Sequence, residues 1–212
     1  MFTGIVRERG EIVAVERIPG GVRLKLKARK IREGMQLGDS IAINGACQTV
    51  MAMEQDFFSI EALHETLRRT TMSGWKPGDL VNLENPLSPH DLLGGHLVKG
   101  HVDGVGVIRA KVRRAGDMVL RVQAPQELMV QVFERGSIAL DGVSLTVVAV
   151  QGNQFSVTLI PYTQRETTLG SKEVGDGVNL ETDMVVKAVQ RLLGPKVKNR
   201  GLTRERLEEL EF

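Results

Sequence analysis

The chain repeats itself at a spacing of 97 residues, and this duplication constrains its fold more than any other feature. The segment SIAINGACQTV (40–50) recurs as SIALDGVSLTV (137–147), an offset of 137 − 40 = 97. At the same offset GDLVNLE (78–84) recurs as GDGVNLE (175–181), with six identical residues in seven. Average composition gives a chance identity of about 1 in 15 per position. The chain therefore contains two copies of one domain.

Each copy has the sequence pattern of short β-strands. Apolar and basic residues alternate over 22–28, which is typical of a half-exposed strand. An apolar run leads into Asn44-Gly45 in the first copy and into Asp141-Gly142 in the second, and both pairs favour a type I′ hairpin turn. With 23 glycines and no long helical periodicity inside either copy, the pattern favours an all-β fold with one small closed barrel per repeat.

Prolines and paired glycines between 86 and 95 indicate a linker between the repeats. We expect one barrel over 1–90, a second over 91–183, and a helix with a charged tail over 184–212. Asp183 can cap this helix, which Gly194 and Pro195 would end. Its apolar stripe comprises Met184, Val185, Ala188, Val189, Leu192 and Leu193. The stripe must be buried against a barrel or against copies of the helix from other subunits, and the sequence leaves both possibilities open.

Composition excludes several classes of function. The 212 residues include 28 basic and 26 acidic side chains and eight aromatic ones, so neither charge nor stacking capacity indicates a nucleic-acid partner. No apolar run approaches the roughly 20 residues that span a bilayer, and the N-terminus lacks the apolar stretch of a secretory signal. The single cysteine, Cys47, cannot form an internal disulfide. We expect a cytoplasmic protein that does not bind a membrane.

Reactive residues that occur in only one repeat are candidates for function. Cys47 aligns with Ser144, and His101 aligns with Ile5, so the thiol and the imidazole belong to different repeats. The alternatives are a buried apolar cysteine and a hydrogen-bonded structural histidine.

A metal site is a further alternative, because His90, His96 and His101 follow one another within twelve residues. Their spacing in a glycine-rich segment does not place three ligands on one face, and no pair of thiolates supports them. A metal hydrolase built on these histidines stays as a rival hypothesis.

Several motifs together resemble the riboflavin synthases, the lumazine-dismutating family. They are MFTGIV (1–6), NGACQTV (44–50), ETLRRT (65–70), GGHLVKGHVDG (94–104), GSIALDGVSLTV (136–147), LIPYT (159–163) and GDGVNLE (175–181). The resemblance runs in order from Met1 to about Leu193. It implies two tandem six-stranded Greek-key barrels plus a C-terminal α-helix, and a homotrimer associated through that helix.

The resemblance also implies an activity, the last step of riboflavin biosynthesis. Two molecules of 6,7-dimethyl-8-ribityllumazine react by transfer of a four-carbon unit, giving riboflavin and 5-amino-6-(ribitylamino)uracil without a metal, nucleotide or redox cofactor. Each barrel would hold one lumazine, with the active site between the first barrel of one subunit and the second barrel of a neighbour. Lumazine synthase is an expected partner. The alternative is a non-catalytic lumazine- or flavin-binding protein of the antenna type.

The family pattern implies substrate-binding residues in both repeats. In the first repeat they are Gly4, Ile5, Val6, Cys47, Gln48, Thr49, Glu61, Ala62, Leu63, His64, Glu65 and Thr66. In the second they are Gly100, His101, Val102, Arg135, Ser144, Leu145, Thr146, Leu159, Ile160, Pro161, Tyr162, Thr163 and Gln164. Arg135 takes the place of a basic residue that reaches a ligand in the adjoining subunit.

The resemblance also assigns catalytic roles. His101 is the candidate general acid/base, since its unperturbed pKa lies near neutrality. Cys47 is the candidate nucleophile or acid/base partner, and Thr49, Ser144 and Thr146 would orient it or the ring. Ser40 and Asp183 occupy further motif positions whose catalytic and structural roles the sequence does not separate.

Four residues depart from the family pattern. Gln48 replaces an apolar residue, His64 a proline, Tyr162 a histidine or other polar residue, and Arg135 a lysine. We expect Gln48 and Tyr162 to alter affinity or ring orientation.

Overall fold

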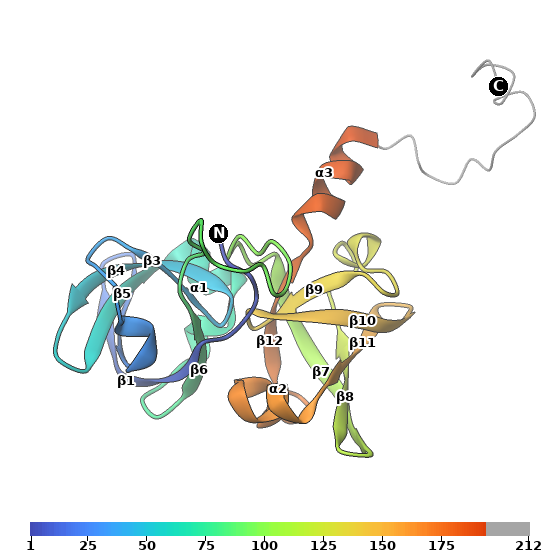
Figure 1. Cartoon of the computed structure of the whole chain (residues 1–212), viewed down its shortest axis with the longest axis horizontal. Coiled ribbons are helices and arrows are strands. Elements are labelled where there is room, and N and C mark those ends of the chain that lie inside the picture. Colours follow the sequence, from blue (N-terminus) through green and yellow to red (C-terminus); the bar gives the residue numbers. More distant parts are fainter. Residues whose placement is uncertain (194–212) are drawn as a thin grey trace, which may run out of the picture.

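The computed structural model describes residues 1–193 and consists of two closed antiparallel barrels that lie side by side (Figure 1). The strands of the first are β1 (Glu8–Ile18), β2 (Gly21–Lys27), β3 (Ser40–Ile43), β4 (Ala46–Met53), β5 (Phe57–Leu63) and β6 (Leu80–Glu84). The strands of the second are β7 (Gly104–Arg114), β8 (Asp117–Gln123), β9 (Ser137–Leu140), β10 (Val143–Gln151), β11 (Gln154–Leu159) and β12 (Gly177–Thr182).

Strand order confirms the predicted fold class. Around the first barrel the order is β1-β2-β5-β4-β3-β6, and around the second it is the equivalent β7-β8-β11-β10-β9-β12. This is a Greek-key arrangement, because β2 pairs with β5 across the hairpins formed by β3, β4 and β5. Closure leaves neither sheet with a free edge. Each barrel has its own apolar interior, with Phe58 buried in the first and Phe155 in the second.

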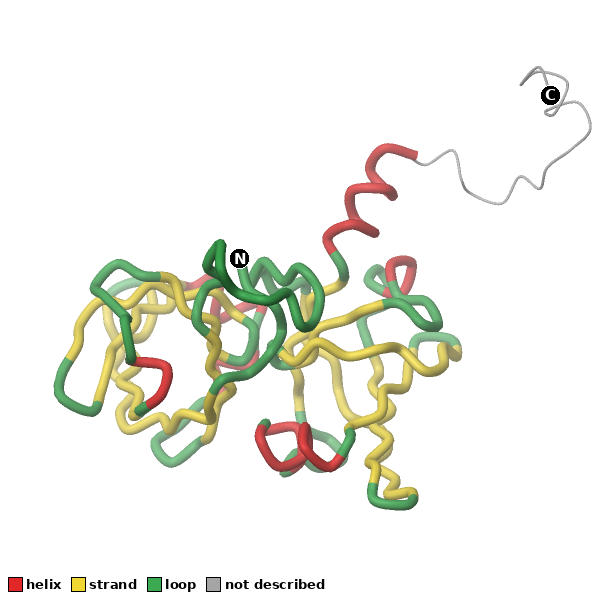
Figure 2. The backbone as a smooth tube through the Cα atoms, in the orientation of Figure 1, coloured by secondary structure: helices red, strands yellow, loops and turns green. Residues whose placement is uncertain are grey.

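The helices are short, and strands form most of the ordered structure (Figure 2). The α-helices are α1 (His64–Arg69), α2 (Pro161–Glu166) and α3 (Met184–Leu193), and the 3₁₀ turns are η1 (Lys30–Arg32), η2 (Thr71–Gly74), η3 (Met129–Gln131) and η4 (Thr168–Gly170). The pairs α1–η2 and α2–η4 are equivalents in the two repeats. Within residues 1–193 no helix is long and apolar enough to cross a membrane.

The C-terminal helix α3 projects from the second barrel (Figure 1). The side chain of Asp183 accepts a hydrogen bond from the Val185 amide at 2.8 Å, so it caps the helix as predicted. A salt bridge of 2.6 Å between Lys187 and Asp103 ties α3 to the barrel. None of its residues is buried, and Leu192 is 85% exposed. The apolar stripe is therefore not covered by a barrel of the same chain. The predicted end at Gly194 and Pro195 and the charged tail lie outside the described residues.

The two predicted hairpin turns meet at the junction of the barrels. Asn44 and Asp141 have φ of 44° and 43°, and the glycines after them 77° and 78°, as a type I′ turn requires. A Cβ on Gly45 would lie 2.6 Å from the backbone nitrogen of Gly142. Glycine is therefore required here both by the turn and by the close approach of the two backbones.

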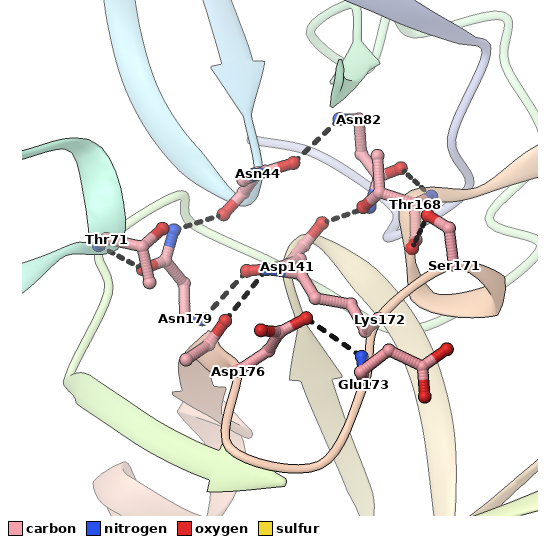
Figure 3. A network of polar contacts seen from close by, with 11 residues as sticks. Asn44, Thr71, Asn82, Asp141, Thr168, Ser171, Lys172, Glu173, Asp176 and Asn179 are labelled. Atoms are coloured by element: carbon pink, nitrogen blue, oxygen red, sulfur yellow. Dashed lines mark hydrogen bonds and ion pairs between the residues drawn. The ribbon is translucent and has the colours of Figure 1, made fainter. Parts of the chain in front are cut away.

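Two buried asparagines lock the barrels together (Figure 3). Asn82 of β6 donates its side-chain amide to the carbonyl oxygen of Asp141 at 2.9 Å and accepts the Thr168 amide at 2.8 Å. Asn179 of β12 makes the two equivalent bonds, to the carbonyl oxygen of Asn44 at 2.8 Å and from the first residue of η2 at 2.8 Å. Both side chains reach across the junction, so their hydrogen bonds exist only when the barrels are docked.

We predict that Asn82→Ala lowers the free energy of unfolding by about 2–5 kcal/mol, because it leaves a buried carbonyl and a buried amide unpaired. Urea-induced unfolding measures the loss. The control is Gln151→Ala at an exposed hairpin position, which should change the free energy by no more than about 0.5 kcal/mol. Equal effects in the two variants would contradict the assigned role of the asparagine.

Candidate active site

Two short segments cross between the barrels, and we call residues 2–6 and 98–102 the crossing segments. They pair with each other through Phe2 and Val98, whose amides and carbonyls bond at 2.7 and 3.1 Å. Each segment leads into its own barrel but also bonds to the other one. The carbonyl of Gly4 accepts the Ser144 amide of β10, and the carbonyl of Gly100 accepts the Cys47 amide of β4, both at 2.8 Å. The predicted site residues of each crossing segment therefore lie beside a strand of the other repeat.

The first half-site combines β4 with the second crossing segment. Cys47 is half-buried, His101 is exposed, and a Cβ on Gly100 would lie only 2.6 Å from the Cβ of Cys47. Ser40 lies opposite the exposed Thr49 in the pairing of β3 with β4. Because β4 and β5 are antiparallel with Val50 opposite Ile60, the predicted segment 61–66 lies at the same end of the sheet as Cys47.

The second half-site combines β10 with the first crossing segment. Ser144 is half-buried and Thr146 exposed, and Gly4 lies against this strand. The register of β10 and β11 places segment 159–164 at the same end as Ser144. A pocket of about 430 Å³ lies beside Ile5 and is also lined by residues of the linker.

His96 belongs to the second half-site, which the sequence did not indicate. Its Nδ1 lies 2.7 Å from the hydroxyl of Ser144, and its amide donates to the carbonyl of Thr3 at 3.1 Å. Burial lowers the pKa of the imidazole, and the nearby charge of Asp183 opposes that shift. The neutral ring can accept the Ser144 proton or donate to its oxygen. Gly95, directly before His96, was the available signal, because a Cβ there would lie 2.8 Å from the Cβ of Ser144.

Strand alternation divides the predicted binding residues between two faces. Gln48 is buried, and its side chain folds back onto the carbonyl of Cys47 at 2.6 Å. Cys47 and Thr49 point to the opposite face from Gln48. Leu159 is buried in the second barrel, whereas Tyr162 is exposed at the start of α2. Two residues that depart from the family pattern thus differ in exposure: Tyr162 lies on the open surface, and Gln48 is buried.

The environment of His101 favours its neutral form. Partial desolvation, followed by the positive charges of Lys99 and Lys187, lowers the pKa of the imidazole, and Asp103 opposes them. A lowered pKa leaves the ring unprotonated at pH 7, where it can accept a proton.

Arg135 adopts a backbone conformation that is unfavourable for any residue with a side chain. Its φ is 67°, in the left-handed region, and the equivalent position in the first repeat is Gly38 with φ of 86°. A non-glycine residue there costs on the order of 1–2 kcal/mol. The side chain is exposed beside β10, where the Arg135 amide bonds to the carbonyl of Val147 at 2.8 Å. Arg135 is therefore a strained position within the candidate site.

The three histidines of the metal hypothesis are not brought together as ligands. His96 is engaged with Ser144, and His101 lies on the second crossing segment. In the part of the chain that the structure describes, no group of three or more His, Cys, Asp or Glu side chains could hold a metal ion.

Comparison with known proteins agrees with this architecture. The family model described as Lumazine binding domain matches residues 3–86 and again residues 99–183. The chain is 43% identical over 197 residues to the riboflavin synthase of Mycobacterium bovis, covering 91% of this chain and 98% of that protein. It is 39% identical over 193 residues to the riboflavin synthase of Actinobacillus pleuropneumoniae, covering 91% of this chain and 90% of that protein.

Solved structures share the fold. The crystal structure of LumP complexed with riboflavin superposes with a TM-score of 0.81 at 24% identity, covering 86% of this chain and 99% of that one. The complex of LumP with 6,7-dimethyl-8-(1′-D-ribityl)lumazine gives 0.79 at 23% identity with the same coverage. The two barrels are thus tandem lumazine-binding domains. The chain belongs to the riboflavin synthase family and is an enzyme, a transferase.

We predict that Lys99→Met raises the pKa of His101, because it removes a positive charge that disfavours the imidazolium. If the neutral ring is the active form, kcat/KM falls as the pH drops through this pKa. The acidic limb of the pH profile should therefore move to higher pH in the variant. Lys30→Met, at an exposed lysine of η1, is the control and should leave the limb in place.

We predict opposite stability effects at the two equivalent left-handed positions. Arg135→Gly relieves strain and should keep or raise the free energy of unfolding by up to about 1 kcal/mol, while turnover falls about tenfold. Gly38→Ala introduces strain and should lower that free energy by about 1 kcal/mol. Chemical denaturation and steady-state rates measure both. A destabilised Arg135→Gly protein with full activity would refute the functional reason for the strain.

Proposed function

We propose that this protein is a riboflavin synthase that converts two molecules of 6,7-dimethyl-8-ribityllumazine into riboflavin and 5-amino-6-(ribitylamino)uracil. The observation that carries the proposal is the pair of equivalent half-sites, each built from a strand of one barrel and the crossing segment of the other. Two similar surfaces suit a reaction whose two substrates are the same molecule. Cys47 and His101 in one and Ser144 with His96 in the other give the two surfaces different chemistry.

Proton transfer at a lumazine methyl group is the step that these residues fit. The C7 methyl is acidic because its anion is delocalised into the ring. His101 is the proposed base, and its lowered pKa supports this role. The carbanion then attacks the partner ring, where Cys47 is the proposed nucleophile or proton carrier. The atoms of two lumazines equal those of the two products, so the exchange needs no added oxidant or reductant.

Alignment of the two rings is proposed as the largest catalytic effect. Holding two reactants in register can contribute on the order of 7–11 kcal/mol, whereas one acid/base residue contributes roughly 10²–10⁴-fold. Backbone amides and hydroxyls near Cys47, Thr49, Ser144 and Thr146 suit the edge atoms and ribityl hydroxyls of the ligand.

A homotrimer is the proposed assembly, with the first half-site of one subunit facing the second half-site of a neighbour. The exposed apolar stripe of α3 supports association through that helix. Arg135, on the open surface beside β10, would reach the ligand of the adjoining subunit. We also propose a cytoplasmic location and an association with lumazine synthase, both of which rest on the family resemblance.

The test is incubation of the purified protein with 6,7-dimethyl-8-ribityllumazine while riboflavin absorbance is followed. Riboflavin should form together with an equimolar amount of the diaminouracil product. Tight binding without a change in colour would favour the non-catalytic antenna-type alternative. Activity that is lost to chelators, with zinc found by elemental analysis, would favour the metal hydrolase.

Single substitutions in the first half-site should slow turnover without abolishing it, because alignment survives them. We expect Cys47→Ser and His101→Gln to lower kcat by at most about 10⁴-fold, with lumazine binding retained. Steady-state kinetics and ligand titration by fluorescence separate the two effects. Complete loss of binding in a folded variant would contradict this division between alignment and proton transfer.

A further inference from the structure

Two buried carboxylates, one in each barrel, hold the crossing segments. Glu181, at the end of β12, accepts the amides of Lys99 at 2.7 Å and Gly100 at 2.9 Å, one on each oxygen. Glu84, at the end of β6, accepts the amides of Thr3 at 2.6 Å and Gly4 at 3.1 Å in the same way, and also the Thr3 hydroxyl at 2.7 Å. Each carboxylate thus fixes two consecutive amides of one crossing segment.

Such carboxylates are costly to bury. Glu84 and Glu181 are only 5% and 3% exposed, and desolvation raises the pKa of both despite the bonds from the backbone. An apolar residue at either position would avoid this cost but would leave two adjacent amides without an acceptor. A carboxylate at this position therefore fixes the crossing segment, which an apolar residue would not do, at the cost of burying a charge.

The contacts of Glu181 continue directly to the reactive residues. Its carboxylate holds the Gly100 amide, the carbonyl of Gly100 accepts the Cys47 amide at 2.8 Å, and the next residue is His101. Glu84 is connected in the same way to the second half-site, through the carbonyl of Gly4 and the amide of Ser144 at 2.8 Å. Glu181 therefore contacts directly only the segment that reaches the first half-site, and Glu84 only the segment that reaches the second.

We propose that Glu181 and Glu84 are positioning residues: Glu181 sets Gly100, and with it the next residue His101, beside Cys47, and Glu84 sets Gly4, and with it the next residue Ile5, beside Ser144. The inference deepens the proposed function and rests on it for its catalytic consequence. Its geometric part, the placement of one crossing segment by one carboxylate, can be measured without any lumazine.

The experiment compares Glu181→Gln with Glu84→Gln. An amide side chain keeps the shape but has one oxygen, so one of the two backbone amides faces another donor. Cys47 is the only cysteine of the chain, so its alkylation by iodoacetamide reports on the first half-site alone. Glu181→Gln should change the alkylation rate at least fivefold, whereas the matched Glu84→Gln should leave it within twofold.

Kinetics give a second readout in the same proteins. Both variants should lower kcat on the order of tenfold with KM changed less than threefold, since alignment of reactive groups is lost rather than the binding surface. Glu173→Gln, at an exposed glutamate, is the control and should change neither quantity. Equal alkylation rates in the two variants, or wild-type kcat in a folded Glu181→Gln protein, would overturn the proposal.

Amide exchange in the wild-type protein decides the matter if a variant does not fold. The amides of Lys99 and Gly100 should exchange at least 10²-fold more slowly than in an unstructured peptide, and exchange at the unstructured rate would overturn the proposal. Failure of the proposed function gives a different pattern. A protein that makes no riboflavin but shows selective alkylation and amide protection would keep the positioning contacts and lose the reaction.

Discussion

The hydrogen bonds of Asn82 and Asn179 across the barrel junction are the constraint on which the rest of the structure depends. Each side-chain amide has one partner on the hairpin turn of the opposite barrel and one on its 3₁₀ turn. These groups are buried, so partial separation of the barrels would leave them without water and without partners. The crossing segments span the same junction, and both half-sites therefore require the docked arrangement.

The junction is symmetric in its backbone but not in its charge. Asp141 occupies the position of Asn44 and is fully buried, with Lys172 at 3.5 Å. The position equivalent to Lys172 in the first repeat is Trp75. Burial raises the pKa of Asp141, and the lysine charge opposes that rise. One repeat thus completes its turn with a neutral amide and the other with an ion pair, so the two halves of the junction have diverged without losing their bonds.

Much of the fold follows from the sequence. The repeat predicted two equivalent barrels, and the Asn-Gly and Asp-Gly pairs predicted turns whose left-handed φ values the structure confirms. Strand alternation would also have predicted that Gln48 faces away from Cys47 and Thr49. The exchange of segments could not be predicted, because its contacts join backbone atoms of Gly4 and Gly100 to other strands. Glu84 and Glu181 likewise resemble solvated ends of strands until their burial is known.

The crossing segments make each barrel incomplete without a second one. A polypeptide limited to the first barrel would carry Gly4 and Cys47. It would lack strand β10, which binds the carbonyl of Gly4, and the carbonyl of Gly100, which binds the amide of Cys47. In two such polypeptides, placed like the halves of this chain, each crossing segment could form its hydrogen bonds with the barrel of the other polypeptide. The duplicated molecule therefore has the geometry of a covalently fused, segment-swapped pair, in which fusion freed the two copies to acquire different side chains.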